Sequence, residues 1–201
     1  MLYLDDFTTG KEISLGHYTV PEKEIIDFAK DYDFQDFHTD PEAAKRSVFG
    51  GLIASGWHTA GICMKLVCQA FMTQTACNGS PGIQDLKWLK PVRPGDTLTG
   101  FVRVTGQLPS KSKPDRGASL QHWALQNQDG DTVFCADVTV LMMRKPQPVE
   151  QAPVAAVGAT AAGDTAETKA EGPDRAELEK WRAQAQSLWF NDGSCTAGKS
   201  E

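Results

Sequence analysis

The segment between Ser47 and Gln84 is the feature of this 201-residue chain that most restricts its fold, because Lys65 is its only formally charged residue. The apolar pattern within it predicts a long helix over about 57–76. A helix that is apolar on most faces is buried on most faces, so other parts of the chain have to wrap around it. The apolar stretch is too short, and too interrupted by polar side chains, to span a bilayer, so we expect no membrane segment.

Downstream of this segment the pattern changes to the two-residue period of strands. The last two predicted strands are joined by Asp129-Gly130, a strong hairpin signal. We expect an antiparallel meander, with one sheet wrapped around the long central helix: an α+β roll of the hotdog fold. Exposed edge strands need cover or pairing, which favours a dimer. The four predicted strands cover residues 85–90, 97–107, 119–128 and 131–143.

The residues before the buried helix predict short helices separated by loops. An extended segment near 13–20 leads into a helix over 21–32, which begins with a proline suited to a first turn. We expect residues 33–38 to be irregular and a second short helix to cover 39–45. A glycine-rich loop over 49–56 then leads into the long helix.

A change in composition divides the chain into three parts. Residues 1–145 form the predicted hotdog domain. Residues 146–173 contain no aromatic residue, no Leu and no Ile and are rich in Ala and Pro, so they predict a flexible linker. Residues 174–201 predict an amphipathic C-terminal helix and tail.

The charge distribution and the cysteines exclude several classes of protein. Residues 1–145 hold 17 acidic and 15 basic side chains and residues 146–201 hold 9 and 5, within a net charge of -6. No basic cluster marks a nucleic-acid surface. The acidic start of the chain is unlike a signal peptide, and the scattered cysteines form no CxxC pair for a metal. We therefore expect a cytoplasmic protein that binds no nucleic acid and no metal.

Asp33 and His38 are the first candidates for chemistry. Loops held by rigid elements often carry catalytic groups, and a histidine that titrates near neutrality can exchange protons beside a carboxylate. Asp36 is a second nearby acid, and Phe34 and Phe37 are candidates for apolar walls. On spacing alone, a His38 that merely caps the next helix is the more common arrangement.

Ser55 and Gly56 open the long helix, where backbone N–H groups have no intrahelical partner. Gly56 would let a ligand carbonyl approach the backbone, and the helix dipole favours developing negative charge, as in an oxyanion hole. A tight turn that needs glycine at positive φ is the simpler interpretation. His58, just inside the helix, is a candidate for the same cavity. A metal cluster of Asp33, His38, Asp40 and His58 matches no ligand spacing.

Two stretches carry a resemblance to a known family. Residues 33–44 (DFQDFHTDPEAA) and 49–57 (FGGLIASGW) resemble the MaoC-like dehydratases, whose best-known members are the (R)-specific enoyl-CoA hydratases. The family pattern is Asp-x-Asn-Pro-x-His, followed by a glycine-rich loop that opens the central hotdog helix. Residues 91–96 (PVRPGD) are similar to the family's turn between strands. The resemblance covers about residues 5–145.

The resemblance implies that Asp33 and His38 are the catalytic pair and that the Gly56 N–H is the oxyanion-hole donor. The implied reaction is reversible addition of water to a trans-2-enoyl thioester, with no cofactor beyond the CoA of the substrate. Which of the two side chains first takes the water proton stays open. The further substrate-binding candidates are Gln35, Phe37, Ser55, His58, Lys111, Lys113 and Arg116.

The basic residues among these candidates lie on one predicted loop, residues 109–117. They are candidates for the CoA phosphates, although a solvated basic loop is the commoner outcome. The resemblance also implies a homodimer with CoA running across the subunit boundary. About 145 residues are enough for one hotdog and too few for two.

The chain departs from the family pattern at two positions. Gln35 replaces the Asn of the motif and can still form hydrogen bonds, but it is longer. Asp36 replaces the Pro. An Asp36 that points inward would favour the charged imidazolium and weaken His38 as a base, whereas one that points outward would have little effect.

Two other functions are known for the hotdog fold or compatible with this chain. The first is a thioesterase, which generally has an acid on or near the central helix. No acid occurs here between Glu42 and Asp85, which counts against a thioesterase. A catalytically silent module that binds acyl thioesters or a protein fits the altered motif and the C-terminal helix with Trp181 and Trp189. Loss of the enoyl absorbance and release of free CoA are the two signals that distinguish hydration from thioester hydrolysis.

Overall fold

The computed structural model describes residues 1–146. The linker predicted over 146–173 therefore lies outside the described residues apart from Pro146, and the helix and tail predicted over 174–201 lie wholly outside them. No helix in the described range is both long and apolar enough to cross a membrane. The elements, in chain order, are η1 (Leu4–Asp6), β1 (Glu12–Thr19), α1 (Glu22–Tyr32), α2 (Asp36–Thr39), α3 (Pro41–Lys45), α4 (Gly56–Ala70), η2 (Met72–Gln74), β2 (Cys77–Gly79), β3 (Ile83–Trp88), β4 (Thr97–Pro109), β5 (Arg116–Gln126) and β6 (Thr132–Met143), where η marks a 3₁₀ turn.

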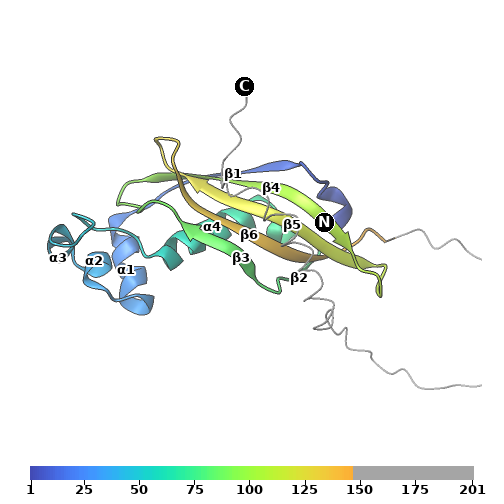
Figure 1. Ribbon diagram of the computed structural model, residues 1–201, viewed down its shortest axis with the longest axis horizontal. Helices are drawn as coiled ribbons and strands as arrows, with labels where there is room; N and C mark the ends of the chain where they lie inside the picture. Colours follow the sequence, from blue (N-terminus) through green and yellow to red (C-terminus); the bar gives the residue numbers. More distant parts are fainter. Residues whose placement is uncertain (147–201) are drawn as a thin grey trace, which may run out of the picture.

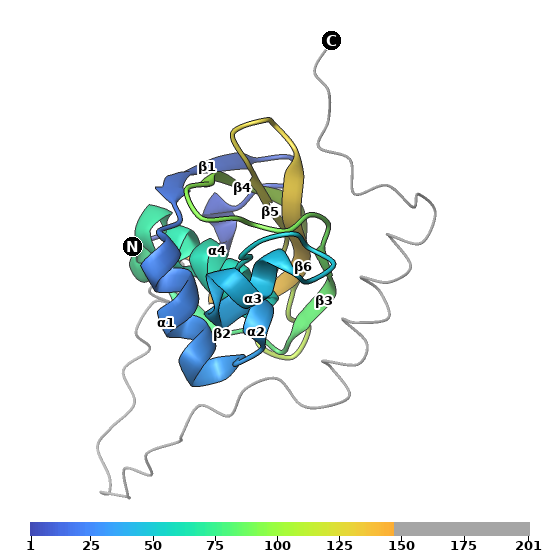
Figure 2. The ribbon, with the colours of Figure 1, turned by 90° about the vertical axis from the view of Figure 1, so that its left-hand side faces the viewer.

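Helix α4 is the centre of the molecule, as its low charge predicts. Ile62, Cys63, Leu66 and Val67 on this helix are each at most 2% exposed. The sheet curves around the helix, which is seen from the side in Figure 1 and from the end in Figure 2. Burial of each large apolar side chain contributes about 1.5–3 kcal/mol, so this interface stabilises the fold strongly. The predicted α+β hotdog architecture is confirmed.

The central helix is shorter than predicted. It ends at Ala70 rather than near residue 76, because Phe71 leaves the helical conformation with φ -156° and ψ -27°. Turn η2 and strand β2 follow. Strand β2 was not predicted, because its three residues are too few to show a two-residue period.

The sheet is antiparallel and has the strand order β1-β4-β5-β6-β2, with β3 also paired to β6. The predicted meander is correct for β4, β5 and β6. It is wrong for the strand at 85–90, because β3 adds beside β6, with Trp88 opposite Phe134, and not beside β4. The free edge of β4 is already taken by β1, where Tyr18 lies opposite Leu98. The chain leaving α4 therefore joins the other edge of the sheet.

The predicted hairpin between the last two strands is present, but its loop is longer than two residues. β5 ends at Gln126 and β6 begins at Thr132. The side chain of Asn127 accepts hydrogen bonds from the backbone N–H groups of Asp129 and Asp131, at 3.1 and 2.9 Å. Gly130 takes the positive φ of 79° that this loop requires.

Helices α1, α2 and α3 gather at one end of the sheet, on the left in Figure 1. Helix α1 begins at Glu22, one residue later than predicted, because Pro21 is extended, with φ -73° and ψ 144°, and is the N-cap. The segment 33–38 is not irregular throughout, since its second half lies in the one-turn helix α2. Asp40 caps α3 by accepting from Glu42 N at 2.8 Å, so His38 is not the cap of that helix. His38 is left available for another role.

Candidate active site

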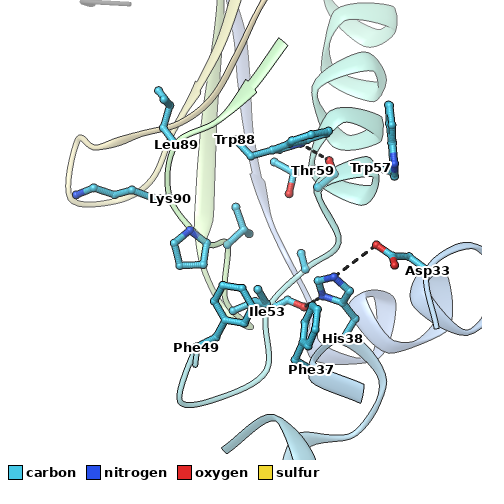
Figure 3. A pocket seen from close by; sticks show the side chains of 14 residues that line it. Asp33, Phe37, His38, Phe49, Ile53, Trp57, Thr59, Trp88, Leu89 and Lys90 are labelled. Carbon is cyan, nitrogen blue, oxygen red and sulfur yellow. Dashed lines mark hydrogen bonds and ion pairs between the residues drawn. The ribbon is translucent and has the colours of Figure 1, made fainter. Parts of the chain in front are cut away.

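A cavity of about 460 Å³ lies where α1, α2 and the first turn of α4 meet the end of β3 (Figure 3). It brings together Asp33 and His38, which are five residues apart in the chain, with Gly56 at the start of α4. The other lining residues are mostly apolar: Phe37, Phe49, Ile53, Ala54, Trp57, Thr59, Trp88, Leu89, Lys90, Pro91 and Val92.

His38 is buried, with 5% of its surface exposed, and its ring orientation is fixed by the glycine-rich loop. Its Nδ1 lies 2.7 Å from the carbonyl oxygen of Ile53. A carbonyl oxygen only accepts, so Nδ1 carries the hydrogen and donates it. Ile53 N in turn donates to the carbonyl oxygen of Phe37 at 3.2 Å. The remaining nitrogen, Nε2, points toward Asp33 (Figure 3).

Asp33 follows the last residue of α1, and its carboxylate lies beside the imidazole. Its Oδ2 is 3.5 Å from His38 Nε2 and accepts from Ser55 Oγ at 2.7 Å. Its Oδ1 accepts from Gln35 Nε2 at 2.7 Å. Partial burial raises the pKa of Asp33, but the hydrogen bonds from Ser55 and Gln35 and the nearby His38 lower it by more. The net pKa lies below the ordinary value, so the carboxylate is ionised at neutral pH.

Ser55 joins the acid to the start of the central helix. It is fully buried and is the N-cap of α4, where its Oγ accepts from Trp57 N at 3.2 Å while donating to Asp33. Gly56 is the first residue of the helix, and within residues 1–146 its N–H has no hydrogen-bond acceptor. The positive end of the helix dipole therefore presents a free donor at the cavity.

Gly56 is required by packing and not by backbone conformation. Its φ is not positive, so the tight-turn interpretation is wrong. The indole of Trp88 covers it so closely that a Cβ at position 56 would lie 2.6 Å from Trp88 Cε2. Trp88 Nε1 also donates to the Gly56 carbonyl oxygen at 2.7 Å, and Trp57 packs edge-on against Trp88. The indole thus holds the first peptide of α4 in place.

The two departures from the family pattern have different surroundings. Gln35 is exposed, yet its amide donates to the Asp33 carboxylate. Asp36 is exposed at the start of α2, and its side chain has no hydrogen bond or ion pair within the described part of the chain. It therefore points outward, and its effect on His38 is small.

His58 lies away from the cavity, so the prediction that it lines the same cavity as Gly56 is wrong. It is 4% exposed and is not among the lining residues. Its ring faces α1, with Nε2 at 3.0 Å from Glu24 Oε1 and the ring face stacked on Phe28. The helix turns position 58 away from the side of α4 on which Gly56 meets the cavity.

The basic loop also lies away from the cavity. Lys111 and Lys113 lie in the turn between β4 and β5, and Arg116 begins β5, at the opposite end of the sheet from α1 (Figure 1). Strand β4 has 13 residues and separates the two ends, which corresponds to about 40 Å at ~3.3 Å per residue. The loop of one chain therefore does not reach the cavity of the same chain.

Most of the apolar lining was not among the predicted site residues. Phe49 begins the glycine-rich loop, while Trp88 and Lys90 lie within the three residues before Pro91 and the turn that follows. Lys90 is half-exposed and forms an ion pair of 2.6 Å with Asp131. Proximity to motifs already identified was the signal that could have found them.

A sheet wrapped around one helix, with this cavity at the helix N-terminus, defines a hotdog protein of the dehydratase class. The chain belongs to the MaoC-like domain family, which matches residues 6–122. Hydration and dehydration are the activities supported at the level of this family. The resemblance stated from the motifs is therefore confirmed.

Several known proteins are similar to this chain. An uncharacterised protein of Bacillus subtilis (strain 168), YdeM, is 31% identical over 142 residues, which cover 70% of this chain and 99% of the relative. An (R)-specific enoyl-CoA hydratase of Rhodospirillum rubrum is 34% identical over 111 residues, covering 54% of this chain and 74% of the relative. The crystal structure of a MaoC-like dehydratase from Rhodospirillum rubrum superposes with a TM-score of 0.68 and 38% identity, covering 73% of this chain and all of that one.

Proposed function

We propose that this chain catalyses the reversible hydration of a 2-enoyl-CoA, or of a related acyl thioester, to the 3-hydroxyacyl thioester. The observation that carries the proposal is the convergence of Asp33, His38 and the unpaired Gly56 N–H on one cavity. The similarity to an (R)-specific enoyl-CoA hydratase supports the substrate class.

The acid and the imidazole face each other as two hydrogen-bond acceptors. Because Nδ1 of His38 donates to Ile53, the neutral ring presents a lone pair at Nε2. Asp33 is ionised and also presents a lone pair. Two acceptors 3.5 Å apart do not bind each other, but one water can donate a hydrogen to each. This is where we place the nucleophilic water.

The Gly56 N–H supplies the complementary charge. In the proposed complex the thioester carbonyl oxygen accepts from this N–H at the positive end of α4. Negative charge grows on that oxygen as the water attacks, and a preorganised donor in a site lined by apolar side chains stabilises it. Trp88 and Trp57 lie beside this donor and limit its access to bulk water.

The proposed reaction balances without another reactant. As the water oxygen bonds to C3 of the enoyl group, one water proton passes to the Asp33–His38 pair. The π electrons of the C2–C3 bond move through C2 to the thioester oxygen, which gives an enolate held by Gly56 N–H. The enolate then takes the proton back from the pair at C2, and the pair returns to its starting state. We therefore propose no cofactor beyond the CoA of the substrate.

We also propose that the protein is a homodimer. Within residues 1–146, β3 pairs with no strand other than β6, so its outer edge is open. Ile83, Trp88 and Leu89, on and just after this strand, are 54%, 46% and 45% exposed. An open strand edge carrying large apolar side chains is a surface that a second copy can cover. A second subunit is also the means by which the basic loop could approach a bound CoA.

The test is turnover by the purified full-length chain with crotonyl-CoA and longer trans-2-enoyl-CoAs. We expect loss of the enoyl absorbance without release of free CoA. Asp33→Asn and His38→Ala should each lower kcat by roughly 10²–10⁴-fold. Asp36→Asn is the matched control, because it removes a carboxylate from the same segment that has no side-chain contact, and it should retain activity.

Each rival function has its own outcome in the same assays. Release of free CoA at the rate of substrate loss would identify a thioesterase. Binding of enoyl-CoA without turnover at any chain length would identify a silent thioester-binding module, and the hydratase proposal would then be wrong.

A further inference from the structure

A buried polar cluster joins α4 to α1 outside the cavity. His58 Nε2 lies 3.0 Å from Glu24 Oε1, and the imidazole stacks on Phe28 with ring centres 4.9 Å apart and an interplanar angle of 14°. His58 is only 4% exposed, whereas histidines in proteins are more often partly solvated. The proposed chemistry does not use this histidine, so its burial needs another reason.

Glu24 is held from more than one side. Its Oε2 accepts from the hydroxyl of Tyr18 on β1, and Lys65 Nζ lies 3.8 Å from the centre of the Tyr18 ring. Burial raises the pKa of Glu24, but the hydrogen bonds from Tyr18 and His58 and the charge of Lys65 lower it by more. Glu24 is therefore an ionised and well-anchored acceptor for His58.

The His58 ring makes this bond through one nitrogen only. Within residues 1–146, its Nδ1 is buried and has no hydrogen-bond partner. A neutral ring with its hydrogen on Nε2 donates to Glu24 and leaves only a lone pair in the apolar surroundings, which costs less than burying a second N–H without an acceptor. The contact is then a directional hydrogen bond.

The bond is one of two polar attachments between the same pair of segments. The other is Ser55 Oγ to Asp33 Oδ2 at 2.7 Å. On α4 the two attachments are one turn apart, at positions 55 and 58. On α1 they are nine positions apart, at 24 and 33, which is about 13 Å along a helix. A single attachment would let α1 rotate relative to α4 about that point. Two separated attachments also fix the angle between the two segments.

We propose that His58 is a positioning residue for the reaction: its bond to Glu24 fixes α1 against the first turn of α4, and so fixes Asp33 relative to His38 and the Gly56 N–H. This inference rests on the proposed function for its effect on turnover, but the attachment itself can be measured separately.

The experiment compares variants at Glu24 with a control at Tyr18. Glu24→Ala removes the acceptor and should lower kcat by roughly 10- to 100-fold, with KM changed less than about two-fold, because misplacement by an ångström has effects of that size. Glu24→Gln keeps an oxygen acceptor for His58 and should retain most of kcat. Tyr18→Phe removes the other bond to Glu24 and leaves the His58 bond intact, so its kcat should fall far less than that of Glu24→Ala.

Hydrogen exchange of the amides at the end of α1, residues 29–33, gives a readout that does not depend on turnover. Exchange should be faster in Glu24→Ala than in Tyr18→Phe or Glu24→Gln at equal global stability. If Glu24→Ala does not fold, His58→Asn takes its place, because the shorter amide cannot reach Glu24.

The outcomes separate the two proposals. An inactive wild type overturns the proposed hydratase function, and the exchange rates alone then decide whether the attachment exists. An active wild type with a folded Glu24→Ala of unchanged kcat overturns the positioning role. The same conclusion follows if only KM rises, or if Glu24→Gln loses as much kcat as Glu24→Ala.

Discussion

Asp33 Oδ2 and His38 Nε2 lie 3.5 Å apart, although two different local structures deliver them. Asp33 sits at the end of α1, and His38 sits inside the one-turn helix α2. Each is then held by the segment before α4, Asp33 through the Ser55 hydroxyl and His38 through the Ile53 carbonyl. The glycine-rich loop therefore sets the distance between the acid and the imidazole.

Ser55→Ala should raise the pKa of Asp33. The variant removes the hydrogen bond from Ser55, which is the largest of the contributions that lower this pKa. The low native pKa means that Asp33 stabilises the fold above its ordinary titration range, and that this stability is lost as the pH falls through the native pKa. In the variant the native pKa lies closer to the unfolded value, so this pH-dependent contribution should be smaller and its loss should be complete at a higher pH. The measurement is the carbon NMR titration of labelled Asp, with the Asp33 signal assigned by its absence in Asp33→Asn.

Ser55→Ala should also destabilise the protein by about 1 kcal/mol through loss of the α4 N-cap. An unchanged or lower midpoint for Asp33 in a folded variant would show that the Ser55 bond does not control the acid.

Gly56→Ala should lower both stability and turnover, because its Cβ would lie 2.6 Å from Trp88 Cε2. Displacing the indole should destabilise the fold by about 1–3 kcal/mol. The measurement is the melting temperature together with kcat for crotonyl-CoA hydration.

Gly61→Ala is the matched control for that substitution. Gly61 lies in the same helix, and a Cβ added there would meet no atom of another part of the fold within 4 Å, so alanine should stabilise the helix by up to about 1 kcal/mol. In a Trp88→Ala background, Gly56→Ala should cost less stability than it does in the wild type. An equal cost in both backgrounds would mean that the indole is not the obstacle.

Cys63 should resist thiol reagents in the folded protein. It is 1% exposed, and burial raises the pKa of its thiol to about 12, so very little thiolate is present at neutral pH. Cys68, on the same helix, is partly exposed and should be labelled much faster by iodoacetamide. Peptide mass spectrometry after timed labelling measures both rates. Equal labelling before unfolding would contradict the buried position of Cys63.

Ile83→Lys should shift the protein from dimer to monomer, because the change places a charge on the open edge of β3, where Ile83 is 54% exposed. Light scattering after size exclusion measures the mass directly. Val48→Lys is the control, since Val48 is 96% exposed and lies far from this strand in the chain. A wild type that is monomeric at all concentrations would rule out the proposed dimer.

Local patterns in the sequence determined the buried helix, most strand positions and the segments that carry the site. The absence of charge from Ser47 to Gln84, apart from Lys65, allowed α4 to be buried, and the apolar side chains on most of its faces favoured that burial. The spacing of Asp33, His38 and Gly56 within motifs resembling a family marked the three groups that the cavity brings together. These properties depend on residues close to one another in the chain.

The tertiary structure alone decided which distant segments meet. β3 pairs with β6 because β1 already occupies the edge of β4, and Trp88 thereby reaches Gly56, 32 positions earlier. The same packing turns His58 toward Glu24 and away from the cavity. Periodicity tells how deeply a residue is buried, but contacts across the fold depend on how whole elements compete for the same surfaces, and no local pattern records that competition.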